Sequence, residues 1–337
     1  MSRLRRSIAS ISFSALLAVG CHSPQAPRPP TAVAEPQAVH AAIDETDSTG
    51  RTPLMIAAGQ SEANVVELLI DSGADVNGRC DDGWTALMAA AAARSTRCVE
   101  LLLRAGAKTG SRWRDGSTPL MLACMMGSVD CARLLVDARA NVNAKDQIGK
   151  TALIHSLLRQ DPELVRLLVD AGAEVKARNE VGVTPLMLAA SYADAASAEI
   201  LIEAGADSGA LDPHGYTALL WAAQFGDAAT VRVLLDGGAD ADHEADGGVT
   251  ALMLAAVRQE AEIVTLLADT SANVNIRTED GTTALHWAAA RGDRDTVAAL
   301  LRAGADPTIR DRRGLTPGDL AAERSDEDGR AIVLLLD

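Results

Sequence analysis

Apolar and small residues return in one fixed register along most of this chain. The stretch from Gly182 to Ala190 reads Gly-Val-Thr-Pro-Leu-Met-Leu-Ala-Ala, and its glycine recurs nine times at an interval of 33 residues, at 50, 83, 116, 149, 182, 215, 248, 281 and 314. Threonine follows each glycine two positions later. Leucine follows two positions further on in every copy except the ninth, where Gly318 stands. The pattern therefore predicts nine copies of one structural unit.

Each copy is predicted to fold as a turn followed by two short helices. Glycine suits a tight turn because it tolerates positive φ, and the threonine hydroxyl is suited to cap the helix that follows. Proline comes next in four copies, at 53, 119, 185 and 317, which is a favoured first position of a helix. A second apolar run with helical spacing, such as Val165, Leu167 and Leu168, predicts the second helix. In six copies a glycine then ends this helix, at 73, 106, 172, 205, 238 and 304.

These motifs resemble the ankyrin repeat, in the order G-x-T-P-L, A-A, V-x-x-L-L and G-A-D-V-N, the last of them at Gly73 to Asn77. The resemblance covers residues 47–337 and implies an all-α repeat solenoid of about nine repeats of 33 residues, the last a truncated cap. In that fold helix-turn-helix units are joined by β-hairpin-like loops. One departure is that the family's histidine after T-P-L is methionine in five copies and is matched only by His286. Apolar packing is expected to replace the hydrogen bonds that this histidine makes between repeats.

The first 20 residues have the layout of a bacterial export signal. Three arginines precede an apolar run from Ile8 to Val19, which is too short for a membrane-spanning helix of about 20 residues. The run ends Leu-Ala-Val-Gly before Cys21, which resembles a lipobox, so we expect lipidation of Cys21; cleavage nearby as an ordinary secretory signal is the alternative. Residues 21–46 hold five of the twelve prolines and are expected to form a tether. The expected location is the bacterial cell envelope, as a periplasm-facing lipoprotein of the outer membrane.

Charge and cysteine content narrow the expected chemistry. The formal net charge is −15, and removal of the signal arginines would make the chain more acidic still. Such acidity argues against nucleic acid and anionic lipid surfaces as partners, so the N-terminal lipid is the expected membrane contact. No cysteine and histidine spacing resembles a zinc site, and neither a metal nor a cofactor is expected. Disulfides are permitted in the periplasm, but buried free thiols are the favoured interpretation of the remaining cysteines, Cys80, Cys98, Cys124 and Cys131.

The few aromatic residues gather at positions that face partners in ankyrin arrays. In that family the partner usually meets the hairpin tips and the exposed ends of the first helices, and exposed aromatic residues are frequent hot spots of interfaces. The alternative is that these side chains pack on neighbouring loops. Trp221 and Trp287, six residues after their glycines, are expected in the core. The predicted contact residues are Trp84, Met125, Met126, Tyr192, His214, Tyr216 and Phe225.

These features predict a protein-binding module rather than an enzyme. Repeats fill the chain after the tether, and the six histidines are scattered, with none beside a nucleophile and a carboxylate. The expected function is to bind a protein partner on the concave face of an array anchored in the cell envelope. Two narrower roles stay open: a periplasmic inhibitor or immunity protein against a toxin or hydrolase, and an envelope scaffold or stress-protection factor.

Overall fold

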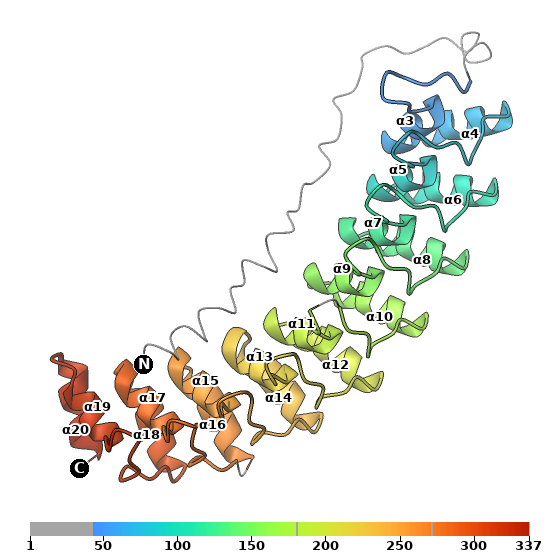
Figure 1. Ribbon diagram of the computed structural model, residues 1–337. Helices are drawn as coiled ribbons and strands as arrows, with labels where there is room; N and C mark the ends of the chain where they lie inside the picture. Colours follow the sequence, from blue (N-terminus) through green and yellow to red (C-terminus); the bar gives the residue numbers. More distant parts are fainter. Residues whose placement is uncertain (1–42, 180, 271, 337) are drawn as a thin grey trace. The chain divides into compact units, whose positions relative to one another are not determined.

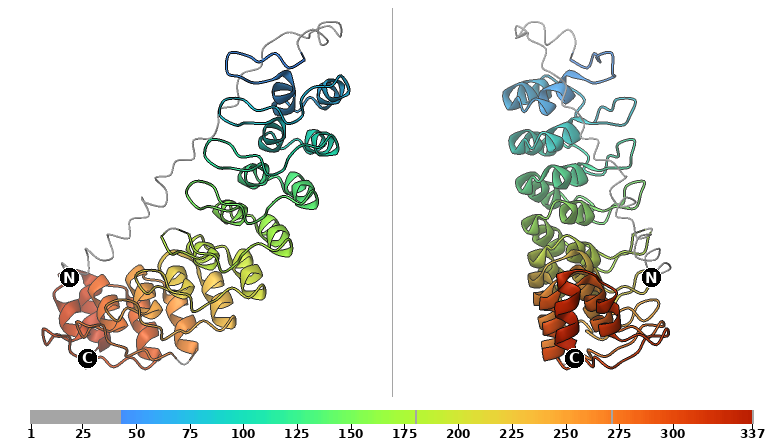
Figure 2. Two further views of the ribbon diagram at one scale, coloured as in Figure 1. Left: turned by 45° about the vertical axis from the view of Figure 1, so that its right-hand side comes forward. Right: turned by 90° about the vertical axis from the view of Figure 1, so that its left-hand side faces the viewer.

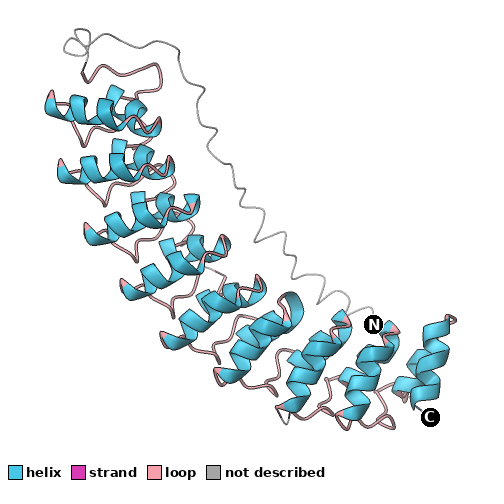
Figure 3. Ribbon diagram, turned by 180° about the vertical axis from the view of Figure 1, so that it is seen from behind, coloured by secondary structure: helices cyan, strands magenta, loops and turns pink. Residues whose placement is uncertain are grey.

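The computed structural model describes residues 43–336 except 180 and 271, and this part of the chain is a stack of helix pairs (Figure 1). Its 18 helices follow one another as nine pairs, one pair for each predicted repeat, and no β strand occurs among them (Figure 3). The expected all-α repeat architecture is therefore confirmed. The predicted export signal, Cys21 and residues 22–42 of the predicted tether lie outside the described residues.

The helices form two rows. First and second helices each make a row of their own, and Figure 2 shows the connecting loops gathered to one side of them. None of the described helices is both long and apolar enough to cross a membrane. The first helices are α3 (Pro53–Gly59), α5 (Ala86–Ala92), α7 (Pro119–Met126), α9 (Ala152–Leu158), α11 (Pro185–Ser191), α13 (Ala218–Phe225), α15 (Ala251–Arg258), α17 (Ala284–Arg291) and α19 (Pro317–Ala322). The second helices are α4 (Ala63–Asp71), α6 (Thr96–Arg104), α8 (Val129–Asp137), α10 (Pro162–Asp170), α12 (Ala195–Glu203), α14 (Ala228–Asp236), α16 (Ala261–Asp269), α18 (Arg294–Arg302) and α20 (Glu327–Leu336).

Threonine starts the first helices, as predicted. In eight repeats the threonine hydroxyl accepts a hydrogen bond of 3.2–3.4 Å from the backbone N–H three residues on, for example from Met55 to Thr52. In the repeat that carries Thr283 the ring of His286 is the partner, and the threonine N–H donates to its Nδ1 at 3.1 Å. The other ring nitrogen lies 3.2 Å from the carbonyl oxygen of Leu315 in the next repeat. His286 therefore makes the bond between repeats that the family resemblance implies.

Methionine at the same position supplies only half of that arrangement. The sulfur atoms of Met121 and Met187 accept a hydrogen bond from the threonine N–H of their own repeat at 3.4 Å. A thioether has no N–H to donate to the next repeat. In these two repeats sulfur therefore takes over the bond within the repeat, and apolar packing remains the expected replacement for the bond between repeats.

Small residues allow the first helices to stack closely. Ala190 of α11 and Ala222 of α13 are fully buried. A Cβ atom on Gly226, which follows α13, would lie 2.8 Å from the carbonyl oxygen of Ala190, so no larger residue fits between these two helices. Apolar burial between such layers stabilises the array, because a single repeat encloses no core of its own.

A left-handed residue ends most second helices. The six predicted glycines have φ between +81° and +92°, and Arg139 takes the same conformation with φ of +61°. A loop then leads into the next repeat, and we number each loop by the repeat that it enters. Loop 2 carries Gly83, loop 4 Gly149, loop 5 Gly182 and loop 6 Gly215.

Side chains join neighbouring loops at two levels. At the first level, an arginine four residues before the hairpin glycine donates to the carbonyl oxygen at the same position of the next loop. At the second level, an asparagine clamps the next loop with both ends of its carboxamide: Asn143 donates to the Gly172 carbonyl oxygen at 3.0 Å and accepts from the Glu174 N–H at 2.9 Å. Asn77 and Asn275 form the same pair of bonds. The arginines of the first level are Arg79, Arg112, Arg178 and Arg277.

At a third level, backbone groups join the hairpin tips. The N–H two residues before the glycine donates to the tip carbonyl oxygen of the preceding loop, as from Gln147 to Asp115 at 2.9 Å. The same bond forms from Asp246, Glu279 and Arg312.

Loops 5 and 6 are joined at the first level only. Arg178 donates to the Leu211 carbonyl oxygen. Lys176 stands where the clamping asparagine would be, and Pro213 has no N–H to donate to the tip carbonyl of Val181. At this junction a single hydrogen bond among the described residues joins the two loops, although the helices beside it pack closely at Gly226.

Candidate functional site

Two tryptophans meet across loops 2 and 3. Trp84, which follows Gly83, and Trp113 are both half-buried, and their ring centroids lie 5.0 Å apart at an interplanar angle of 74°. The Arg114 guanidinium lies over the Trp113 ring, 5.1 Å from its centroid, and forms an ion pair of 3.4 Å with Asp82. We call these four residues the tryptophan cluster. Edge-to-face rings with a cation above one of them are mutually attractive, so the cluster keeps a defined geometry.

The backbone holds the tryptophan cluster in place. In each of the two hairpins, the residue three before the glycine donates its N–H across the turn: Cys80 to the Trp84 carbonyl oxygen at 3.1 Å, and Trp113 to that of Ser117 at 3.0 Å. Arg79 links the loops by donating to the Arg112 carbonyl oxygen at 2.8 Å. Trp84 was a predicted contact residue, whereas Trp113 was missed. Trp84 directly follows its hairpin glycine, and Trp113 lies 29 positions later. The 33-residue period alone places these two residues on adjacent loops, and this signal could have identified the pair.

Met125 and Met126 form the last turn of α7, at the opposite end of that helix from its hairpin. Both are half-buried, which is compatible with their predicted role as contacts. The Arg159 guanidinium donates to the Met125 carbonyl oxygen at 3.1 Å. The end of α7 is therefore fixed by the following repeat.

The expected exposure of Tyr216 is wrong. Its side chain is only 7% exposed. Burial, together with the nearby carboxylates of Asp212 and Asp246, raises the pKa of Tyr216 to about 12. The residue after a hairpin glycine is also buried in other loops, as at Val183 and Val249, so this position points between loops rather than into solvent.

The aromatic residues of repeats 5 and 6 do not form one exposed group. Phe225 is half-buried with its ring centroid 5.6 Å from that of Trp221, and Tyr192 is half-buried at the end of α11. His214 is exposed at the tip of loop 6. Trp221 and Trp287 are buried as predicted. The tryptophan cluster of repeats 2 and 3 is therefore the better candidate for a contact surface.

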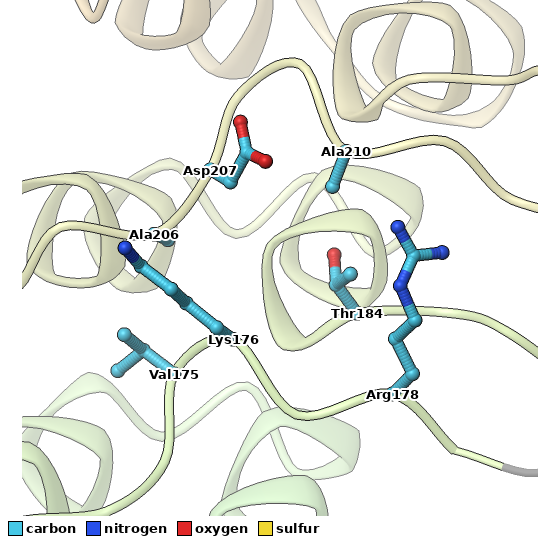
Figure 4. A pocket seen from close by; sticks show the side chains of 7 residues that line it. All are labelled: Val175, Lys176, Arg178, Thr184, Ala206, Asp207 and Ala210. Atoms are coloured by element: carbon cyan, nitrogen blue, oxygen red, sulfur yellow. The ribbon is translucent and has the colours of Figure 1, made fainter.

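A small cavity lies between loops 5 and 6, where the asparagine clamp is absent. Its volume is about 110 Å³, and Figure 4 shows Lys176 and Arg178 of loop 5 facing Asp207 and Ala210 of loop 6. Sites for drug-sized ligands usually measure about 300–1,000 Å³, so this cavity suits a few waters or one small side chain. It is lined by Val175, Lys176, Arg178, Thr184, Ala206, Asp207 and Ala210.

The described residues contain no group of three or more His, Cys, Asp or Glu side chains able to hold a metal ion. The four cysteines of the array are free thiols, of which only Cys80 is partly exposed.

Comparison with known families agrees with the architecture. A family model described as ankyrin repeats (3 copies) matches residues 32–113, 105–179, 158–245 and 238–311, which together cover most of the chain. A search of curated proteins found no match. The matched segments and the stacked helix pairs identify the chain as a member of the ankyrin-repeat family.

Proposed function

We propose that this protein binds a protein partner through its loop face, with the tryptophan cluster as the anchor. Ankyrin repeats are generally protein interaction modules without catalytic activity. The observation that carries the proposal is the pairing of Trp84 and Trp113 beneath Arg114, because Trp and Arg are the residues most enriched among interface hot spots. Half-buried rings lose little side-chain freedom on binding, since the loops already hold them.

Crosslinking in living cells tests this proposal. A photoreactive amino acid in place of Asp81, which is exposed beside the tryptophan cluster, is expected to give a discrete protein adduct. Changing both Trp84→Ala and Trp113→Ala should weaken binding by ~2 kcal/mol or more, about 30-fold in Kd, and abolish the adduct. Leu68→Ala, an exposed residue of α4, is the matched control and should leave the adduct unchanged. An adduct of equal yield in the double variant would show that the partner binds elsewhere.

We further propose that the array acts in the bacterial cell envelope, held by an acylated Cys21 and the proline-rich tether of residues 21–46. The support is the charged, apolar and lipobox-like order of the first residues. In cells given an alkyne fatty acid, the wild-type chain should be labelled and sediment with membranes, and Cys21→Ser should be unlabelled. Equal labelling of both chains would refute acylation at this residue.

The identity of the adduct separates the two narrower roles. A secreted toxin or hydrolase would indicate an inhibitor or immunity protein. A resident envelope protein would indicate a scaffold or stress-protection factor.

A further inference from the structure

Three consecutive loops carry large exposed aliphatic side chains that sequence reasoning did not assign. Ile148 and Val181, each directly before its hairpin glycine, are 40% and 55% exposed, and Leu211, four residues before the glycine of loop 6, is 42% exposed. We call these residues the apolar tip patch. Single exposed apolar residues are common, but a run on neighbouring loops marks an interaction surface. In loops 2, 3 and 8 the position before the glycine is acidic instead, with Asp82, Asp115 and Asp280.

Acidic side chains lie on both sides of the apolar tip patch. Asp81 is exposed in loop 2, and Asp246 and Glu279 are exposed in loops 7 and 8. None of these three forms an ion pair with another described residue, whereas Asp82 and Asp280 are paired with arginines of the following loops. Unpaired carboxylates on either side of an apolar centre favour a ligand with the complementary order of charge.

The centre of the patch also offers a hydrogen-bond acceptor. The tip carbonyls of loops 3, 6, 7 and 8 accept an N–H from the following loop, but Pro213 cannot donate one to Val181. The Val181 carbonyl oxygen is therefore available to a backbone N–H of a bound chain. An extended segment supplies such donors at regular intervals.

We infer that the apolar tip patch binds an elongated segment of a partner protein, with aliphatic residues at its centre and Lys or Arg at both ends. The inference rests on the proposed function and defines the chemistry of the partner. Layers are ~10 Å apart, so loops 4 to 6 span ~20 Å, or about six residues of extended chain. The acidic tips of loops 2 and 7 are five layers apart, so basic residues about 15 positions from one another meet both.

Synthetic peptides test this inference without knowledge of the partner. The probes are three fluorescein-labelled 16-residue peptides: one with a Val/Ile/Leu centre and lysines at both ends, one with the same centre and glutamates at both ends, and one with a Ser/Gly centre and lysine ends. Fluorescence anisotropy with the full chain should show saturable binding of the first peptide only. Because exposed carboxylates are screened by salt, its affinity should fall as the ionic strength rises.

Substitutions then place the binding site. Ile148→Ser with Val181→Ser should weaken binding of the first peptide at least tenfold, and both residues are exposed enough to be changed without loss of folding. Val65→Ser with Leu68→Ser is the matched control, because these α4 residues are 39% and 45% exposed and lie away from the hairpin tips. Equal binding of all three peptides, equal loss in the control, or no binding at millimolar peptide would overturn the inference. A dimer of the chain in analytical ultracentrifugation that dissociates when Ile148 and Val181 are changed to serine would also overturn it.

The two proposals fail in different ways. A crosslinked adduct at Asp81 that persists in the Ile148 and Val181 variant but disappears in the tryptophan variant would leave the proposed function intact and remove the apolar tip patch. Binding of the first peptide only, without any crosslinked adduct in cells, would support the apolar tip patch and remove the tryptophan cluster as the anchor.

Discussion

Changing Lys176 to asparagine should restore the missing clamp between loops 5 and 6. The Asn143 clamp shows the required geometry, with one bond to a carbonyl oxygen 29 residues ahead and one from an N–H 31 residues ahead. At Lys176 these groups belong to Gly205 and Asp207, beside the cavity of about 110 Å³ that can receive the carboxamide. Each hydrogen bond is worth about 0.5–1.5 kcal/mol, and both partners are exposed, so about 1 kcal/mol in total is expected.

Amide hydrogen exchange measures this gain at the bond itself. A stabilisation of about 1 kcal/mol should slow exchange of the Asp207 N–H about fivefold in Lys176→Asn. Lys176→Asp is the matched control, because a carboxylate can accept from this N–H but cannot donate to the carbonyl. Asp242 shows the accepted bond at the equivalent position, where it accepts from the Asn273 N–H at 2.8 Å. Its effect should therefore be smaller. Unchanged exchange in Lys176→Asn would refute the view that the clamp stabilises the loop layer.

Three further predictions concern single residues. The pKa of Tyr216 is raised to about 12, against about 10 in an unfolded chain, so between these values the folded state keeps a proton that the unfolded state releases. The Tyr216 side chain should therefore add no pH dependence to the stability below about pH 10 and should lower the stability between about pH 10 and 12. Urea denaturation should show this fall, and Tyr216→Phe should reduce it. Cys80 should be the first array cysteine to react with a thiol reagent, because the other three thiols are buried and burial raises the pKa of Cys124 to about 12. Rapid reaction of more than one array cysteine in the folded chain would contradict this. Gly83→Ala should destabilise the array more than Gly73→Ala in chemical denaturation. Both have positive φ, worth about 1 kcal/mol of strain, but only at Gly83 would the new Cβ lie 2.7 Å from a carbonyl oxygen; equal losses would show that the loop yields freely.

The repeat architecture could be predicted because each signal is local. A glycine that must adopt positive φ, a threonine that caps the next helix and a run of small residues are each read within a few positions, and nine copies exclude coincidence. The role of Met121 was only partly foreseen. Its sulfur accepts a hydrogen bond that the histidine would take, which apolar patterning does not reveal.

The contact surface could be predicted only in part, because exposure depends on neighbouring loops. Trp84 and Tyr216 occupy the same place after the hairpin glycine, yet Trp84 is half-buried and Tyr216 is buried. Val183 and Val249 are also buried at this place, whereas Arg51 and Lys150 are only partly buried. The role of Trp113 also depends on a neighbouring loop, because its ring packs against Trp84 of loop 2. Such pairings follow from the 33-residue period once a position is compared with its neighbours in space rather than with its equivalents in sequence.

The junction of loops 5 and 6 has a mechanical consequence. One arginine bond joins these loops, whereas the helices beside them are tightly stacked, so we expect the loops to separate here more readily than the helices. A partner inserted between these two loops would break fewer bonds than between loops 8 and 9, where all three levels are present. This junction lies beside Val181, so bending there would change the distance between Val181 and Leu211.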